Sequence, residues 1–142
     1  MIKHKFNARA GWYTADLRGP FPKNSQPGLI HFDSKLEVIY ARQLELLTIS
    51  NGILGWQRSY ENWDFNERAP KPYRANSQIK PDFKYWESDG TPVWVEVKGY
   101  ARKESLTQIS RAIKYYPERR LLIYTRNGTF SAENYLQLVE RK

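Results

Sequence analysis

The chain has 142 residues, no cysteine and only two histidines, which excludes disulfide bonds, thiolate zinc sites and histidine-rich metal sites. Any bound metal must therefore be held by carboxylates, which favour a hard ion such as magnesium. The formal net charge of +8 and the sequence pI of about 9.7 indicate a polyanionic partner, usually nucleic acid.

No stretch of the sequence has the character of a membrane segment or a secretion signal. Its apolar runs fall short of the roughly 18 residues that cross a bilayer. Residues 1–5 are not followed by the apolar stretch of a signal peptide. We therefore expect a soluble cytoplasmic protein with no membrane partner.

The first 30 residues are rich in glycine and proline and carry only one weak strand pattern, at residues 12–17. We expect residues 1–30 to form an N-terminal arm and residues 31–142 to form one domain. A helix begins near Asp33 and Ser34, where Ser34 and Glu37 fit a capping box. Asn51-Gly52 ends this helix.

The rest of the chain alternates between strand and helix patterns. We expect strands at residues 53–60, 79–86, 93–98 and 121–125, a loop at 62–76, and helices at 106–116 and 131–139. The order of helix, three strands, helix, strand and helix predicts an α/β fold with a mixed central sheet flanked by helices.

The strand at residues 93–98 carries charge where a buried sheet is normally apolar. Its three valines share one face, so Trp94, Glu96 and Lys98 share the other. A three-residue loop, Ser88-Asp89-Gly90, would place Asp82 opposite Glu96 and Lys80 opposite Lys98. A two-residue loop would instead place Asp82 opposite Val97 and separate the two carboxylates.

Two carboxylates about 5 Å apart repel each other unless a cation lies between them. Magnesium is typically bound by one or two carboxylates, water and a substrate phosphate. Lys98 beside them would orient or deprotonate an attacking water, or neutralise charge on phosphorus. The pattern thus predicts metal-assisted cleavage of phosphodiesters.

These residues resemble a known signature. Pro81-Asp82 followed by Glu96-Val97-Lys98 is similar to the motif of the PD-(D/E)xK nuclease superfamily. Residues 32–37 resemble the first-helix motif of small phage nucleases and transposon-end endonucleases. That segment and Tyr116-Pro117-Glu118 are also similar to a phage junction-resolving endonuclease. The resemblance spans residues 31–126.

The resemblance implies a restriction-endonuclease-like core of order αβββαβ and activity with Mg²⁺ or Mn²⁺, leaving a 5′-phosphate. It implies catalytic roles for Glu37, Asp82, Glu96 and Lys98, and a metal site at Asp82, Glu96, Val97 and Glu37. It also implies a bacterial cell, or one infected by phage, as the setting. Glu37 remains open, because a helix cap alone accounts for it.

The expected partner is DNA, cut by a homodimer, since cutting two strands takes two sites. Polar residues expected to contact DNA are Lys80, Lys84, Arg74, Arg102, Lys103, Gln108 and Arg111. Two substrates remain open: branched DNA such as a four-way junction, or a specific duplex site as in homing or transposon-end endonucleases. A non-catalytic nucleic-acid-binding protein is the alternative of another class.

Overall fold

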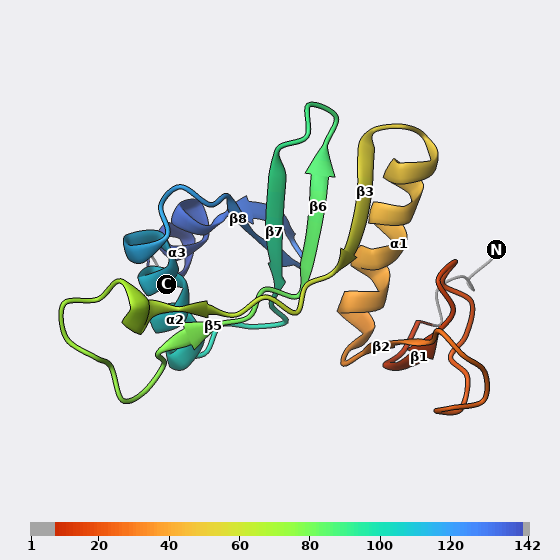
Figure 1. The fold of residues 1–142 in the computed structure, drawn as a ribbon, viewed down its shortest axis with the longest axis horizontal. Coiled ribbons are helices and arrows are strands. Elements are labelled where there is room, and N and C mark those ends of the chain that lie inside the picture. Colours follow the sequence, from red (N-terminus) through yellow and green to blue (C-terminus); the bar gives the residue numbers. More distant parts are fainter. Residues whose placement is uncertain (1–7, 141–142) are drawn as a thin grey trace.

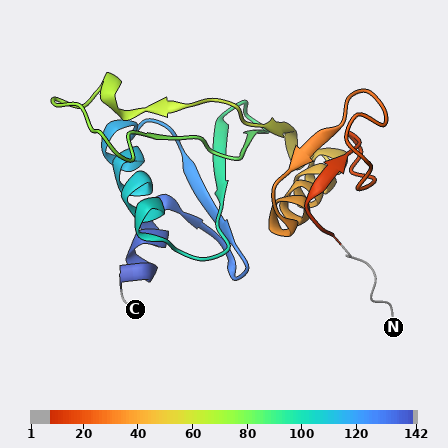
Figure 2. The same ribbon diagram turned by 90° about the horizontal axis from the view of Figure 1, so that it is seen from below.

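The fold is built on a five-stranded sheet, with α1 on one side and α2 and α3 on the other (Figure 1, Figure 2). The computed structural model describes residues 8–140. The sheet and its helices comprise, in chain order, α1 (Lys35–Ile49), β3 (Ile53–Arg58), β6 (Phe83–Glu87), β7 (Pro92–Val97), α2 (Lys103–Tyr115), β8 (Leu121–Thr125), β9 (Gly128–Ser131) and α3 (Ala132–Glu140). The predicted α/β class with a mixed sheet is confirmed.

The strands lie in the order β3-β6-β7-β8-β9. β7 and β8 run parallel and are joined through α2, whereas the other neighbouring strands are antiparallel. Lys98 and Thr125 therefore emerge at the same edge of the sheet, and the Lys98 N–H donates to the Tyr124 carbonyl at 2.9 Å. That edge gathers the ends of both parallel strands.

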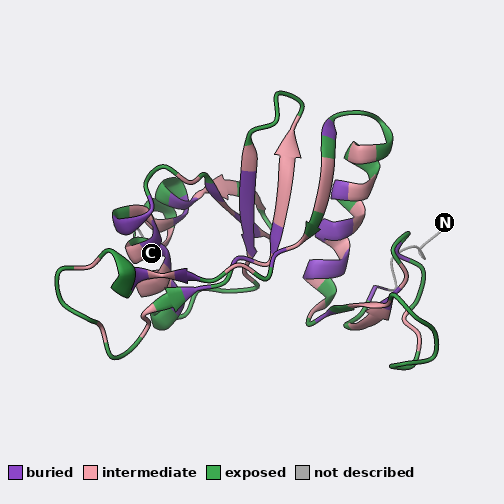
Figure 3. Ribbon diagram, viewed as in Figure 1, coloured by how far each residue is buried: buried purple, intermediate pink, exposed green. Residues whose placement is uncertain are grey.

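Alternation along β7 divides the core into two parts. Val93 and Val95 are buried with Phe83 in the cluster that contains α1. Trp94 faces the opposite way and is buried with Ile123 among residues of α2 and α3. In Figure 3 the buried residues run along the strands and the helix faces turned toward them. The predicted separation of the two faces of β7 is confirmed.

The turn between β6 and β7 has the predicted length and conformation. The Glu87 N–H donates to the Thr91 carbonyl at 2.9 Å, which leaves residues 88–90 as the loop. Gly90 has φ +89°, in the left-handed region that favours glycine. A three-residue loop with a left-handed glycine is therefore what joins the two strands.

This turn sets the register that the site depends on. Phe83 pairs with Val95, so the same register places Asp82 beside Glu96. The Asp82 N–H donates to the Val95 carbonyl at 2.9 Å, where the ladder ends. The alternative register, with Asp82 opposite Val97, is not the one formed.

The predicted strand at residues 79–86 is wrong in its first part. Gln78–Ile79 forms β5, which pairs with β4 (Trp63–Asp64) in a separate two-stranded sheet. The break falls at Pro81, which has no N–H to donate to a ladder. Lys80 consequently does not pair with Lys98, contrary to the sequence-based prediction.

Residues 61–80 form a wing that extends from the main sheet to α2 (Figure 1, Figure 2). The predicted loop at 62–76 thus contains β4 and a 3-10 turn, η1 (Phe65–Glu67). The Arg111 guanidinium donates to the Ala75 and Asn76 carbonyls at 2.7 and 2.9 Å. These bonds hold the wing against α2.

Residues 8–30 of the predicted N-terminal arm pack onto the fold, and residues 1–7 of the arm lie outside the described residues. A ribbon of β1 (Gly11–Tyr13) and β2 (Ile30–Phe32) packs beside α1, with Tyr13 and Phe32 fully buried in its core. The predicted strand at 12–17 is shorter than expected, because Leu17 closes a turn onto Thr14 and has φ +65°.

β9 was not predicted, and it pairs with β8 as a hairpin immediately before α3. Within residues 8–140, no helix is long and apolar enough to cross a membrane.

The turn predicts an asymmetric response to alanine. Gly90 and Gly55 both have open space where a Cβ would stand, but only Gly90 has a positive φ. Gly90→Ala should therefore lower the free energy of unfolding by about 1–2 kcal/mol. Gly55→Ala should leave it unchanged or raise it by up to about 1 kcal/mol. Urea unfolding measures both, and equal effects would contradict the assigned turn.

Candidate active site

Asp82 and Glu96 meet where β6 begins and β7 ends. The Val97 N–H donates to Asp82 Oδ2 at 2.8 Å, which fixes the Asp82 carboxylate against β7. Glu96 is buried, with 8% of its surface exposed. The structure thus brings together the two acids that the turn register predicted, and a Val97 backbone group beside them.

Lys98 lies on the same side of β7 as Glu96. Its Nζ is 3.0 Å from Glu96 Oε2, and its side chain is 18% exposed. The other carboxylate oxygen, Glu96 Oε1, is buried and accepts no hydrogen bond from a described residue when Asp82 is ionised. While Asp82 holds a proton, its carboxyl group forms a hydrogen bond with that of Glu96. A buried acceptor with no donor is rare in native structures and calls for an explanation.

Glu37 enters the site from the first turn of α1. Its N–H donates to Ser34 Oγ at 3.1 Å, and its Oε1 accepts the Asp33 N–H at 3.2 Å. The predicted capping of the helix by Ser34 is confirmed, but the Glu37 side chain accepts the N–H of Asp33 instead of the Ser34 N–H that a capping box uses. The same side chain is buried, and its Oε1 is 3.0 Å from Arg58 Nη1. Glu37 is therefore both a helix-capping residue and a member of the acidic site.

Arg58 is the residue of this site that the sequence did not indicate. It ends β3, and its side chain is only 12% exposed. Its guanidinium lies over the rings of Phe32 and Phe83, at 5.1 and 5.0 Å from their centroids. The contact with Glu37 is an ion pair without hydrogen-bond alignment, so Arg58 Nη1 has no hydrogen-bond partner among the described residues. No local pattern predicts an arginine that reaches a distant helix.

The three carboxyl groups act on one another electrostatically. Burial, and next the charge of Glu96, raise the pKa of Asp82 to about 8. Burial and the charge of Asp82 raise the pKa of Glu37, against the attraction of Arg58. Burial raises the pKa of Glu96, and Lys98 opposes that shift. Two cations thus leave the three acids under-neutralised.

The donor chemistry of this cluster fits a hard divalent cation. No group of three or more acidic or histidine side chains among residues 8–140 already has the arrangement of a metal site. Magnesium, however, is commonly held by one or two carboxylates together with water and phosphate. Asp82 and Glu96 supply two such groups, and a cation would satisfy Glu96 Oε1, which has no donor once Asp82 is ionised.

Several residues expected to contact DNA instead make contacts within the chain. Lys84 Nζ lies 3.0 Å from Glu61 Oε2. The Gln108 amide donates to the Gln78 carbonyl of the wing at 2.9 Å. Arg111 holds the wing in the same way. Their hydrogen-bonding groups are used internally in this structure.

Other residues of that set remain available. The side chains of Lys80, Arg74 and Lys103 are exposed and form no hydrogen bond or ion pair with other described residues. Arg102 is exposed as well and donates to the Tyr100 hydroxyl at 2.8 Å. Of the seven residues expected to contact DNA, these four therefore have exposed charged side chains.

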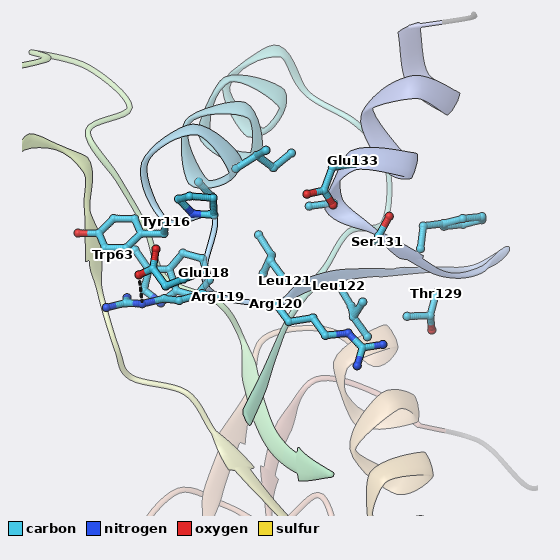
Figure 4. Close-up of a pocket in the computed structure, with 15 residues that line it drawn as sticks. Trp63, Tyr116, Glu118, Arg119, Arg120, Leu121, Leu122, Thr129, Ser131 and Glu133 are labelled. Atoms are coloured by element: carbon cyan, nitrogen blue, oxygen red, sulfur yellow. Dashed lines mark ion pairs between the residues drawn. The ribbon is translucent and has the colours of Figure 1, made fainter. Parts of the chain in front are cut away.

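A pocket of about 530 Å³ opens at the far end of β8 (Figure 4). It is bordered by Arg120 and Leu121, where β8 begins, and by Ser131 and Glu133 near the start of α3. None of the four candidate catalytic residues lines it. The acidic cluster lies beyond the opposite end of the parallel strands, so this pocket is separate from it.

Comparison of the chain with protein-family models, with curated proteins and with solved structures finds no match.

The raised pKa values predict how stability depends on pH without metal. Between about pH 4 and pH 8, the folded protein holds a proton on Asp82 that the unfolded chain has released. Stability should therefore fall as pH rises, by at most about 1.4 kcal/mol per pH unit for each such proton. Asp82→Asn should make this slope shallower, as measured by urea unfolding in a chelating buffer. The exposed-site control Asp16→Asn should keep the wild-type slope, and wild-type stability that rises with pH would contradict the account.

Proposed function

We propose that the protein is a metal-dependent endonuclease that cleaves DNA at the cluster of Asp82, Glu96, Lys98 and Glu37. The observation that carries the proposal is a buried group of three mutually repelling acids, in which Glu96 Oε1 is left without a donor once Asp82 has lost its proton. Such an arrangement is costly in a folded protein and is found where function requires it.

Asp82 and Glu96 would hold a magnesium or manganese ion, with the backbone of Val97 beside them. When bound, such an ion polarises the phosphodiester and lowers the pKa of a coordinated water. Lys98, 3.0 Å from Glu96, is placed to orient the attacking water and to offset charge on the phosphate. Glu37, paired with Arg58, adds a third carboxyl group to the site from α1.

DNA is the proposed substrate because the chain carries a net charge of +8. Exposed cations lie on the wing at Lys80 and Arg74 and on α2 at Lys103, where none is paired within residues 8–140. We place branched DNA ahead of a specific duplex site as the preferred substrate. A homodimer would supply the second site needed to cut two strands.

A non-catalytic DNA-binding domain is less well supported by this geometry. A basic surface suffices to bind DNA, and it requires no buried acids. The buried acids Asp82 and Glu96 lower stability as the pH rises, and when ionised they weaken attraction for phosphate. A catalytic metal site accounts for these buried acids, whereas DNA binding alone does not.

Cleavage of a supercoiled plasmid and of a four-way junction, each with Mg²⁺, tests the proposal. Wild type should cut at least one of them, and Glu96→Gln should lower the rate by about 10²- to 10⁴-fold while still binding DNA. Glu87→Gln is the matched control, because Glu87 is on β6 and pairs with Arg120 away from the site. Glu87→Gln should cut as wild type does.

Equal cutting by wild type and Glu96→Gln would contradict the site assignment. Cutting of the junction with an intact plasmid would favour a branched substrate. If neither is cut, a library of duplex sequences with the same two variants decides whether any DNA is a substrate.

A further inference from the structure

A pocket of about 510 Å³ lies directly beside the proposed active site. Lys98 belongs to both, because it pairs with Glu96 and also lines this pocket. The pocket continues from Lys98 to Thr125, which ends the neighbouring parallel strand β8, to Asn127 after it, and to α3. Ligands of open α/β sheets commonly bind at this carboxyl edge of parallel strands.

The walls of the pocket suit a flat, partly polar ring. Aromatic side chains of Tyr100, Phe130 and Tyr135 line it. The side-chain amide of Asn127 at its border forms no bond with any described residue, so it is free to donate and accept. Aromatic walls with one amide are the combination that stacks and hydrogen-bonds unpaired bases.

The charge around the pocket favours an anionic ligand. Lys98, which is also paired with Glu96 of the neighbouring acidic site, is the cation that lines it, and none of the described lining residues is acidic. Arg102 adds a second cation at the rim, where its guanidinium lies 5.2 Å from the centre of the Tyr100 ring. A base attached to a phosphate would place its ring on the aromatic wall and its anion toward these cations.

The rim also exposes apolar surface that the fold itself does not cover. Tyr100 is 68% exposed and Leu138 is 41% exposed, and both line the pocket. Neighbouring exposed apolar groups around a hollow are typical of a binding site.

We propose that this pocket binds the base of a nucleotide adjacent to the phosphate that is cleaved, with Tyr100 as the stacking residue and Asn127 as the polar contact. The inference rests on the proposed nuclease function and specifies how its substrate is held. A base enters such a pocket only if it leaves its stack, and this costs least where the base is already unpaired. The pocket therefore favours junctions, flaps and single strands over uninterrupted duplex.

The test uses 2-aminopurine deoxyribonucleoside 5′-monophosphate in Mg²⁺ with the full chain. This probe has no phosphodiester to be cut, so binding is measured apart from catalysis. Stacking should quench its fluorescence, and amide NMR signals of Gly99, Tyr100, Thr125 and Asn127 should shift. Tyr100→Ser should weaken binding by about 5- to 150-fold. Leu138→Ala should weaken it too, whereas Leu47→Ala, at a similarly exposed leucine of α1, should not.

Quenching with shifts confined to the pocket supports the proposal even if no DNA is cut, in which case the nuclease function alone fails. DNA cleavage without nucleotide binding at these amides overturns the pocket and leaves the nuclease intact. Inorganic phosphate is the second probe: if it causes the same shifts, the site captures phosphate and not a base. Shifts that follow protein concentration instead of nucleotide would assign the pocket to a second copy of the chain and would also overturn the proposal.

Discussion

The site is organised around one constraint: the carboxyl groups of Asp82, just before β6, and Glu96, near the end of β7, lie close together. Both carboxyl groups are held by backbone or ion-pair contacts, with Asp82 accepting the Val97 N–H and Glu96 beside Lys98. Burial raises the pKa of both groups, and the charge of Glu96 raises that of Asp82 further, whereas the hydrogen bond from Asp82 lowers that of Glu96. The fold tolerates this because the surrounding structure fixes both positions.

Three separate features of the chain position the three acidic side chains of the site. The three-residue turn with Gly90 sets the register, and a loop one residue shorter would turn Asp82 to the other face. Pro81 ends the pairing of β6 and sends the preceding chain into the wing. Arg58 holds Glu37 toward the pair from α1. Each feature is local, but their combined product is a site shared by three strands and a helix.

The parts of the site that were predictable from sequence are those governed by short-range rules. Alternation along β7 placed Glu96 and Lys98 on one face, and a three-residue loop at 88–90 placed Asp82 beside Glu96, but the sequence left a two-residue Asp89-Gly90 loop open. The capping pattern located Glu37. Arg58 and the pocket beside Lys98 depend on how α1 and α3 pack on the sheet, which no local pattern specifies. The short β4, β5 and β9 strands were missed because two to four residues carry too little periodicity.

The structure also shows which basic side chains have partners within the chain, which the sequence does not reveal. Arg111 and Lys84 contact other residues of the chain, whereas the side chains of Lys80, Arg74 and Lys103 have no partner among the described residues.

The most direct test of the account is a structure of the protein crystallised with Mn²⁺, in which the ion is located by its anomalous scattering. The account predicts manganese bound between the carboxylates of Asp82 and Glu96, with Glu96 Oε1 as a ligand. Manganese absent from that position, with the two carboxyl groups still directly against each other, would contradict it.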